Sequence, residues 1–186
     1  DGVKFTEYKF DADKPEYADT IYLLRAIWGS SPDDVWAVGA AGTIINWDGS
    51  QWKKVPSPTK IDIRDIWGVS HNDIYAIGFS LTGLYELLHY DGVSWKLITN
   101  KVTPTGTYQF GTIWLDKSGL GVIAGSSGFM RNGNMWVRQD GNDFARIQRV
   151  RGSAVNNIFA SGQYGRLLHY NGVEWYRIRD FESGPP

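Results

Sequence analysis

The chain contains no cysteine among its 186 residues. This absence excludes disulfide bonds, thiol nucleophiles and every zinc site that uses cysteine ligands. Only three histidines are present, and no apolar run approaches the roughly 20 residues that a membrane-spanning helix needs. We therefore expect a soluble protein that binds no metal and no cofactor and that does not insert into a membrane.

An excess of charge of either sign is also missing. The 19 basic and 20 acidic side chains give a formal net charge of -1, and the basic ones are scattered along the chain. A nucleic-acid-binding protein needs a basic patch, so nucleic acid is not an expected partner. The chain begins with Asp1 and not with Met, and it shows no signal segment. We expect a processed mature chain or a piece of a longer protein.

Aromatic residues and glycine are abundant. Aromatic residues make up 15% of the chain, with nine Trp, and there are 22 Gly. This combination fits many short strands joined by tight turns, where rings fill the space between sheets and glycines adopt positive φ.

One motif recurs four times in the chain: Asp-Gly or Asn-Gly, followed by a tryptophan three residues after the glycine. The copies lie at 48–52, 91–95, 132–136 and 171–175, and a related segment at 1–5 ends in Phe. Short apolar segments of strand length precede each copy, and no helical pattern interrupts them. Asp-Gly or Asn-Gly between two strands favours a type I′ hairpin. Each repeat therefore predicts a four-stranded antiparallel meander.

A repeat of about 40 residues made only of short strands is typical of a β-propeller blade. One such meander cannot bury both faces, so successive units must stack. We predict an all-β fold, a single β-propeller domain or propeller fragment over 1–186. It has an outer strand at 1–10 and blades at 21–55, 61–99, 108–139 and 145–180. Four units plus one strand leave three arrangements open: a fragment of a longer propeller, which is slightly favoured, a closed four-blade ring, or a ring completed by two chains.

The segment 26–39 reads AIWGSSPDDVWAVG, and 65–78 echoes it. These strings resemble the repeats of secreted bacterial propeller proteins, often labelled glucosyltransferase-like, and the resemblance covers nearly the whole chain. It implies a surface, adhesive or assembly module outside the cytoplasm, whether periplasmic, cell-surface or secreted. The hairpin motifs also resemble the Asp-box of sialidase-like propellers, which reads Ser-x-Asp-x-Gly-x-x-Trp. The residue between Asp and Gly is absent in every copy here, which argues against a sialidase.

No set of catalytic groups stands out from the repeat, whether paired carboxylates or a nucleophile beside a base. His89 and His169 share one repeat position, which indicates a structural role. A set of acidic residues recurs in one loop of the repeat, where turn capping explains them more simply than calcium binding. This set is Asp33, Asp34, Asp73 and Asp116. We therefore predict that the protein is not an enzyme.

Arginines occur on the innermost strand of three repeats: Arg25, Arg64 and, one position later, Arg149. Innermost strands line the central channel of a propeller, so these guanidinium groups are candidates to converge on an anion or an acidic glycan. Simple solvation at a polar channel mouth is the alternative. Residues that break the repeat are further candidates for contact with a ligand or partner. They are Phe79, Leu81, Tyr85, Glu86, Tyr108 and Tyr164.

We predict a non-catalytic binding or assembly module that presents loops to a protein partner or to another copy of itself. Two alternatives stay open. One is a carbohydrate-binding, lectin-like propeller, in which non-repeat aromatic residues stack on a glycan. The other is the non-catalytic remnant of a glycan-processing enzyme.

Overall fold

The computed structural model describes residues 23–79, 85–98, 110–132, 135–139, 144 and 146–178. In this part of the chain, 16 strands form four sheets, each a four-stranded antiparallel meander. Blade 1 contains β1 (Leu24–Ser31), β2 (Asp34–Gly39), β3 (Ile44–Trp47) and β4 (Trp52–Lys54), with the 3-10 turn η2 (Ala40–Gly42) between β2 and β3. Blade 2 contains β5 (Asp62–Ser70), β6 (Asp73–Phe79), β7 (Tyr85–Tyr90) and β8 (Trp95–Leu97). Blade 3 contains β9 (Phe110–Leu115), β10 (Gly121–Gly125), β11 (Gly128–Asn132) and β12 (Met135–Arg138). Blade 4 contains β13 (Ile147–Ala154), β14 (Asn157–Gly162), β15 (Leu167–Tyr170) and β16 (Trp175–Ile178).

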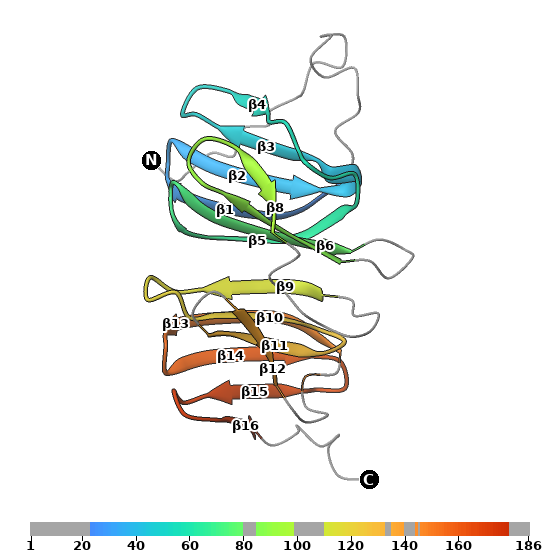
Figure 1. Cartoon of the computed structure of the whole chain (residues 1–186), viewed down its shortest axis with the longest axis vertical. Helices are drawn as coiled ribbons and strands as arrows, with labels where there is room; N and C mark the ends of the chain where they lie inside the picture. The colour runs from blue at the N-terminus through green and yellow to red at the C-terminus, as the bar shows by residue number, and fades with distance from the viewer. Residues whose placement is uncertain are drawn as a thin grey trace, which may run out of the picture.

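The sheets are the blades of a β-propeller, as the repeat predicts. Extensive contacts join β1 to β5, β5 to β9 and β9 to β13, so the first strand of each blade is innermost. Among the described strands, β1 and β13 share at most a marginal contact, and the four inner strands form an open arc. Blades 1 and 2 occupy the upper half of Figure 1, and blades 3 and 4 the lower half. No helix in the described residues is long and apolar enough to cross a membrane.

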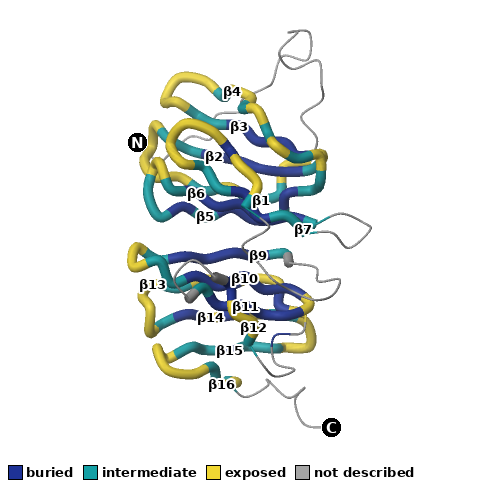
Figure 2. The backbone as a smooth tube through the Cα atoms, viewed as in Figure 1, coloured by how far each residue is buried: buried dark blue, intermediate teal, exposed yellow. Residues whose placement is uncertain are grey.

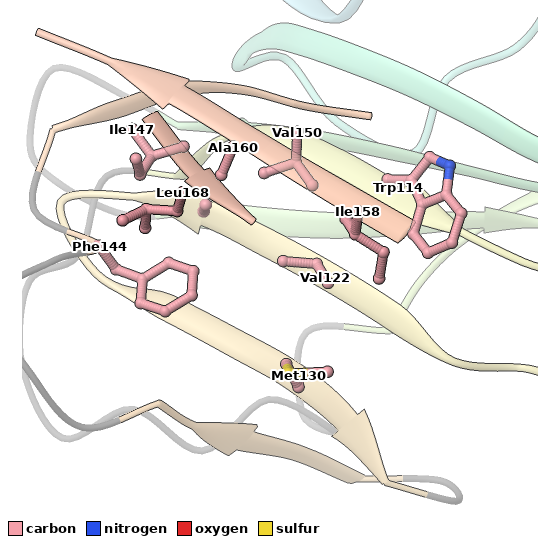
Figure 3. Packing of buried hydrophobic residues seen from close by; sticks show 10 residues of the cluster. Trp114, Val122, Met130, Phe144, Ile147, Val150, Ile158, Ala160 and Leu168 are labelled. Atoms are coloured by element: carbon pink, nitrogen blue, oxygen red, sulfur yellow. The ribbon is translucent and has the colours of Figure 1, made fainter. Parts of the chain in front are cut away.

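Apolar cores fill the three spaces between successive blades. Figure 3 shows the core between blades 3 and 4, where Trp114, Val122 and Met130 of blade 3 meet Val150 and Ile158 of blade 4. The strand β6 packs against blades on both sides and is buried along most of its length, whereas β14 of the terminal blade alternates between buried and less buried residues. In Figure 2, buried residues lie along the strands where blades meet, and the hairpin loops are mostly exposed. Burial on both faces explains why the central strands read as continuous apolar runs.

A tryptophan on the inner strand links each of the first three blades to the next. The three residues occupy equivalent register positions; they are Trp28, Trp67 and Trp114. The indole Nε1 of Trp67 donates to Leu115 O at 2.7 Å, and that of Trp114 donates to Gly152 O at 3.1 Å. A Cβ added to Gly68 would lie 2.2 Å from the Trp28 ring, and one added to Gly152 would lie 2.7 Å from the Trp114 ring. The rings therefore occupy the space that a side chain on the next blade would fill.

In blade 4 the equivalent position carries Arg151. Its guanidinium group reaches Asp65 of blade 2 through two hydrogen bonds, of 3.0 and 3.1 Å. The carboxylate of Asp65 is fully buried and also accepts hydrogen bonds from Thr112 Oγ1 and Ile113 N. Thr112 Oγ1 in turn accepts a hydrogen bond from Val150 N at 3.1 Å. One buried carboxylate thus ties together the inner strands of blades 2, 3 and 4.

The Asp-Gly and Asn-Gly hairpins differ from the predicted turn. A type I′ turn needs positive φ at both central residues, but among the described non-glycine residues only Ala41, Arg146 and Tyr164 have positive φ. The type I′ prediction for this motif is therefore wrong. In blade 1 the Asp48 carboxylate accepts the N–H groups of Ser50 and Gln51, both at 2.9 Å. Asp91 and Asn171 do the same in blades 2 and 4. The side chain, in an Asx turn, closes the loop and removes the need for a second positive φ.

The histidines and loop acids identified in the sequence serve the fold. Asp34 accepts a hydrogen bond from Asn46 Nδ2 at 3.0 Å, and the same pairing joins Asp73 to His89 at 2.7 Å in blade 2. In blade 4 the pairing joins Asn157 to His169 at 3.0 Å. The described residues contain no group of three or more His, Cys, Asp or Glu side chains that could hold a metal ion.

We expect Gly68→Ala to lower the free energy of unfolding by about 1–3 kcal/mol because the new methyl group overlaps the Trp28 ring. Urea denaturation measures the change. The matched control is Gly111→Ala, where a Cβ meets no atom within 4 Å, and its expected loss is below about 0.5 kcal/mol. Equal losses in the two variants would contradict the role of the ring contact.

We expect Arg151→Met to lower the free energy of unfolding by about 2–3 kcal/mol, because it removes a charge-assisted pair from buried Asp65. The loss stays at the lower end because Asp65 keeps the donors Thr112 and Ile113. Lys53→Met, which breaks the solvent-exposed Lys53–Asp48 pair, is the control and should leave the urea midpoint unchanged. A midpoint unaffected by Arg151→Met would show that the network does not stabilise the arc.

Candidate functional site

The inner strands of all four blades begin around one open cavity of about 690 Å³. The lining residues come from the segment that enters β1, from the first residues of the inner strands, and from the ends of β6, β10 and β14 with their hairpins. They are Leu23, Leu24, Arg25, Arg64, Phe79, Gly111, Gly125, Ser126, Arg146, Ile147, Gln148, Arg149 and Gln163. This position corresponds to the mouth of the central channel in a propeller, and we call the cavity the channel mouth.

A β-bulge near the start of each inner strand directs one residue into the channel mouth. A bulge leaves its residue without a cross-strand partner and re-aims the side chain out of the regular alternation. Shifts in strand register mark these bulges in all four blades. The residues are Arg25, Arg64, Gly111 and Gln148, and all four line the channel mouth. Arg149 follows the bulge of blade 4 by one position, which accounts for its offset from Arg25 and Arg64 in the repeat.

Arg25 and Arg64 share a single carboxylate. Their Nη2 atoms lie 2.8 and 3.4 Å from Oδ2 of Asp62. The guanidinium group of Arg64 also lies over the ring of Phe79, 4.6 Å from its centre, which favours a cation in this place. The Nε atoms of both arginines are buried and have no hydrogen-bond partner among the described residues. Two cations therefore compete for one anion on this side of the channel mouth.

The pKa shifts reflect this imbalance. Burial alone would raise the pKa of Asp62, but the Ala41 N–H and the adjacent Arg25 and Arg64 outweigh burial, so the pKa of Asp62 is lowered. The pKa of Arg64 is also lowered, first by burial and then by the charge of Arg25, with Asp62 acting in the opposite direction. Arginine stays charged at every physiological pH. Burial and the neighbouring Arg25 therefore both make the charge of Arg64 costly, and Asp62 offsets part of this cost.

On the blade 4 side of the channel mouth, the described contacts of Arg146 and Arg149 are with neutral acceptors. Arg146 Nη1 donates to Gln163 Oε1 at 3.2 Å and to the Tyr164 hydroxyl at 3.1 Å. Arg149 Nη1 donates to the carbonyl oxygen of Gln148 at 3.2 Å. Neither arginine has a carboxylate partner among the described residues. The described residues on the blade 4 side of the channel mouth thus carry a net positive charge.

Backbone strain occurs at the rim of the channel mouth. Arg146 has φ 66° and Tyr164 has φ 60°, a conformation that costs a bulky L-residue about 1–2 kcal/mol. Tyr164 and Gly165, with φ 66°, form the type I′ centre of the β14–β15 hairpin. The Tyr164 side chain is 78% exposed, and the Arg146 guanidinium group lies 5.5 Å from the centre of its ring. Strained residues of this kind cluster at ligand sites.

The structure brings together five of the nine residues proposed from the sequence. Arg25, Arg64, Phe79 and Arg149 line the channel mouth, and Tyr164 stands at its rim. Tyr85 and Glu86 are paired with Phe79 and Gly78 on neighbouring strands but do not line the cavity. Tyr85 packs against the core between blades 2 and 3, where burial raises its pKa to about 12. Leu81 and Tyr108 lie outside the described residues.

Arg146, Gln148 and Gln163 also line the channel mouth, although the sequence pattern did not single them out. A comparison of repeats identifies the first of these, because Arg146 stands at the position that carries Asp62 in blade 2. The described lining residues include no carboxylate and no histidine. They offer cationic and amide donors, an arrangement suited to binding an anion.

No protein-family model matches the chain, and no curated protein sequence matches it significantly. Solved structures do match. YCF48 bound to D1 peptide is similar with a TM-score of 0.60 at 15% identity, over 83% of this chain and 54% of that chain. The extracellular domain of the hybrid two-component system BT3049 from B. thetaiotaomicron gives a TM-score of 0.63 at 15% identity, over 87% of this chain and 24% of that one. The extracellular domain of the one-component system BT4673 from the same organism gives 0.59 at 14%, over 86% and 25%. The chain thus spans about half of YCF48 and a quarter of the two extracellular domains, and the likeness shows the propeller fold.

The lowered pKa of Asp62 gives a prediction about stability. Its ionised form stabilises the fold at pH values above its unfolded pKa of about 3.9, and that stabilisation is lost as the pH falls through the lower folded value. We expect Asp62→Asn to lower the free energy of unfolding near neutral pH by about 1–3 kcal/mol and to reduce the loss of stability in acid. Urea denaturation at several pH values measures both effects. A variant as stable as the native chain at neutral pH would contradict the pairing of Asp62 with Arg25 and Arg64.

Proposed function

We propose that the protein is a non-catalytic binding module that captures a segment of a protein partner at the channel mouth, outside the cytoplasm. The observation that carries this proposal is the convergence of all four blades on one open cavity lined by guanidinium and amide donors. Its volume of about 690 Å³ falls within the range of ligand pockets in proteins.

The rim and wall of the channel mouth have the side chains that protein interfaces use as anchors. Arg64 lies over Phe79, and Arg146 lies near the Tyr164 ring. Arginine and tyrosine are enriched among the residues that contribute most to binding energy. The blades hold these side chains on a rigid scaffold, so a partner segment meets a surface that is ordered before binding.

The similar structures support both parts of the proposal. YCF48 was solved bound to a D1 peptide, which supports a protein segment as the ligand. BT3049 and BT4673 contribute extracellular domains, which supports a location outside the cytoplasm for this chain.

A carbohydrate-binding function is the second candidate. The observation that favours it is Tyr164, whose ring is 78% exposed at the rim and is free to stack on a sugar on one face. Against it, four arginines line the channel mouth, and the aromatic residue that lines it, Phe79, lies under Arg64. A protein segment can contact the arginines as well as Tyr164, and so uses more of the site than a sugar stacked on Tyr164 alone.

Peptide and glycan arrays probed with the purified chain test the proposal. We expect saturable binding of peptides that weakens about tenfold or more in Arg64→Gln and in Tyr164→Ala, because each removes an anchor. The control Lys53→Gln, on the outer strand of blade 1, should bind as the native chain does. Peptide binding that is the same in all variants would contradict a site at the channel mouth. Glycan binding lost in Tyr164→Ala, without peptide binding, would establish the lectin instead.

A further inference from the structure

We infer that the group recognised at the channel mouth is a carboxylate on an acidic stretch of the partner, and that Arg146 and Arg149 of blade 4 bind it. This inference rests on the proposed function and names the chemistry of its ligand. It follows from the charges at the site, the partners they already have, and the repeat positions they occupy.

The charge at the channel mouth departs from that of the whole chain. Four guanidinium groups line it, and among the described residues Asp62 is the one carboxylate that pairs with any of them. The local surplus is therefore three positive charges, whereas the chain as a whole carries a formal net charge of -1. The nearby Arg151 does not add to the surplus, because it forms an ion pair with buried Asp65. A protein that is close to neutral has concentrated cations around one cavity.

The surplus lies on the blade 4 side. Asp62 pairs with Arg25 and Arg64, so those two guanidinium groups are partly neutralised. Within the part of the chain that the structure describes, Arg146 and Arg149 donate to amide, phenol and carbonyl oxygens and to no carboxylate. A guanidinium group has five N–H donors in a planar fork, so each retains donors for an incoming anion. A carboxylate matches this fork through two parallel hydrogen bonds.

The repeat supports a carboxylate in particular. Asp62 and Arg146 occupy equivalent positions at the start of their inner strands, as do Arg64 and Gln148 two residues later. In blade 2 the chain supplies a carboxylate of its own to the arginines around it. In blade 4 that carboxylate is replaced by a cation, so the matching anion has to come from the ligand. Asp and Glu side chains are the carboxylates that an unmodified protein segment carries along its length.

Neutral donors complete the site. Gln163 and Gln148 line the cavity beside the arginines, and Gln side chains bind backbone N–H and C=O groups of an extended segment. The strained φ of Arg146 and Tyr164 holds the guanidinium group and the ring together at the rim. The site is therefore ordered before the ligand arrives, which lowers the entropic cost of binding.

Fluorescence anisotropy with defined probe peptides tests the inference. The probe is a labelled peptide of alternating Glu and Gly, and its comparison is the isosteric peptide of alternating Gln and Gly. Each is made with a free and with an amidated C-terminus, which separates side-chain carboxylates from the terminal one. We expect the Glu peptide to bind at least about tenfold more tightly than the Gln peptide, with little effect of amidation, and to weaken as salt is raised.

Matched variants locate the site. We expect Arg149→Gln and Arg146→Gln each to weaken binding of the Glu peptide by about tenfold or more, and Arg149→Lys to retain part of the affinity because it keeps the charge but loses the fork. Arg177→Gln on the outer strand β16 is the control and should change nothing. Urea midpoints confirm that the exposed substitutions leave the fold intact.

Equal binding of the Glu and Gln peptides would overturn the carboxylate inference. A loss of affinity in the Arg177→Gln control as large as that in the Arg146 and Arg149 variants would also overturn it. Affinity that depends on the free C-terminus alone would also overturn it, since the terminal group would then be the ligand. Array peptides that bind at the channel mouth without any need for acidic residues would leave the proposed function standing while this inference fails. Loss of every peptide interaction would reject both.

Discussion

The contact between an inner-strand tryptophan and the backbone of the next blade is the interaction on which the rest of the structure depends. A four-stranded meander of this size cannot bury both of its faces, and the ring of Trp28 against Gly68, like that of Trp114 against Gly152, sets how closely two blades approach. Hydrogen bonds from the indole N–H groups of Trp67 and Trp114 to backbone carbonyls fix the rotation of blade 2 on blade 3 and of blade 3 on blade 4. Because this contact repeats, the inner strands start side by side around one point, and the cavity forms there.

Departures from the repeat account for the features that a regular propeller would not have. Arg151 in place of the fourth tryptophan reaches a buried carboxylate two blades away, so the arc is held by an ion pair as well as by apolar cores. The bulges of the inner strands direct Arg25 and Arg64 out of the sheet and into the channel mouth. The exchange of Asp62 for Arg146 at equivalent positions then leaves the blade 4 side with unbalanced cations. The inner strands therefore carry both the residues that hold the blades together and, at a few other positions, the residues of the proposed binding site.

Much of this architecture was predictable from the sequence because it depends on local patterns. Runs such as 74–78 and the spacing of the Asp-Gly motifs predict the strands and the four blades, and the position of Arg25 and Arg64 on inner strands predicts that they reach the channel. The propeller resemblance is confirmed at the level of the fold, while no family model supports its glucosyltransferase-like or Asp-box label. The type I′ turn was wrong because the Asp48 side chain satisfies the backbone donors itself. Bulges depend on cross-strand register, and Asp65 and Arg151 are 86 residues apart, so neither could be predicted from local sequence.

In the proposed recognition, Arg146 and Arg149 at the channel mouth bind an acidic protein segment. The most direct measurement is NMR of the arginine side-chain Nε–Hε groups in ¹⁵N-arginine-labelled protein during titration with the alternating Glu and Gly peptide. We expect saturable shifts of the Arg146 and Arg149 signals, with the signals of Arg138 and Arg177 on the outer strands unchanged. Shifts spread evenly over all arginines, or confined to the outer strands, would contradict it.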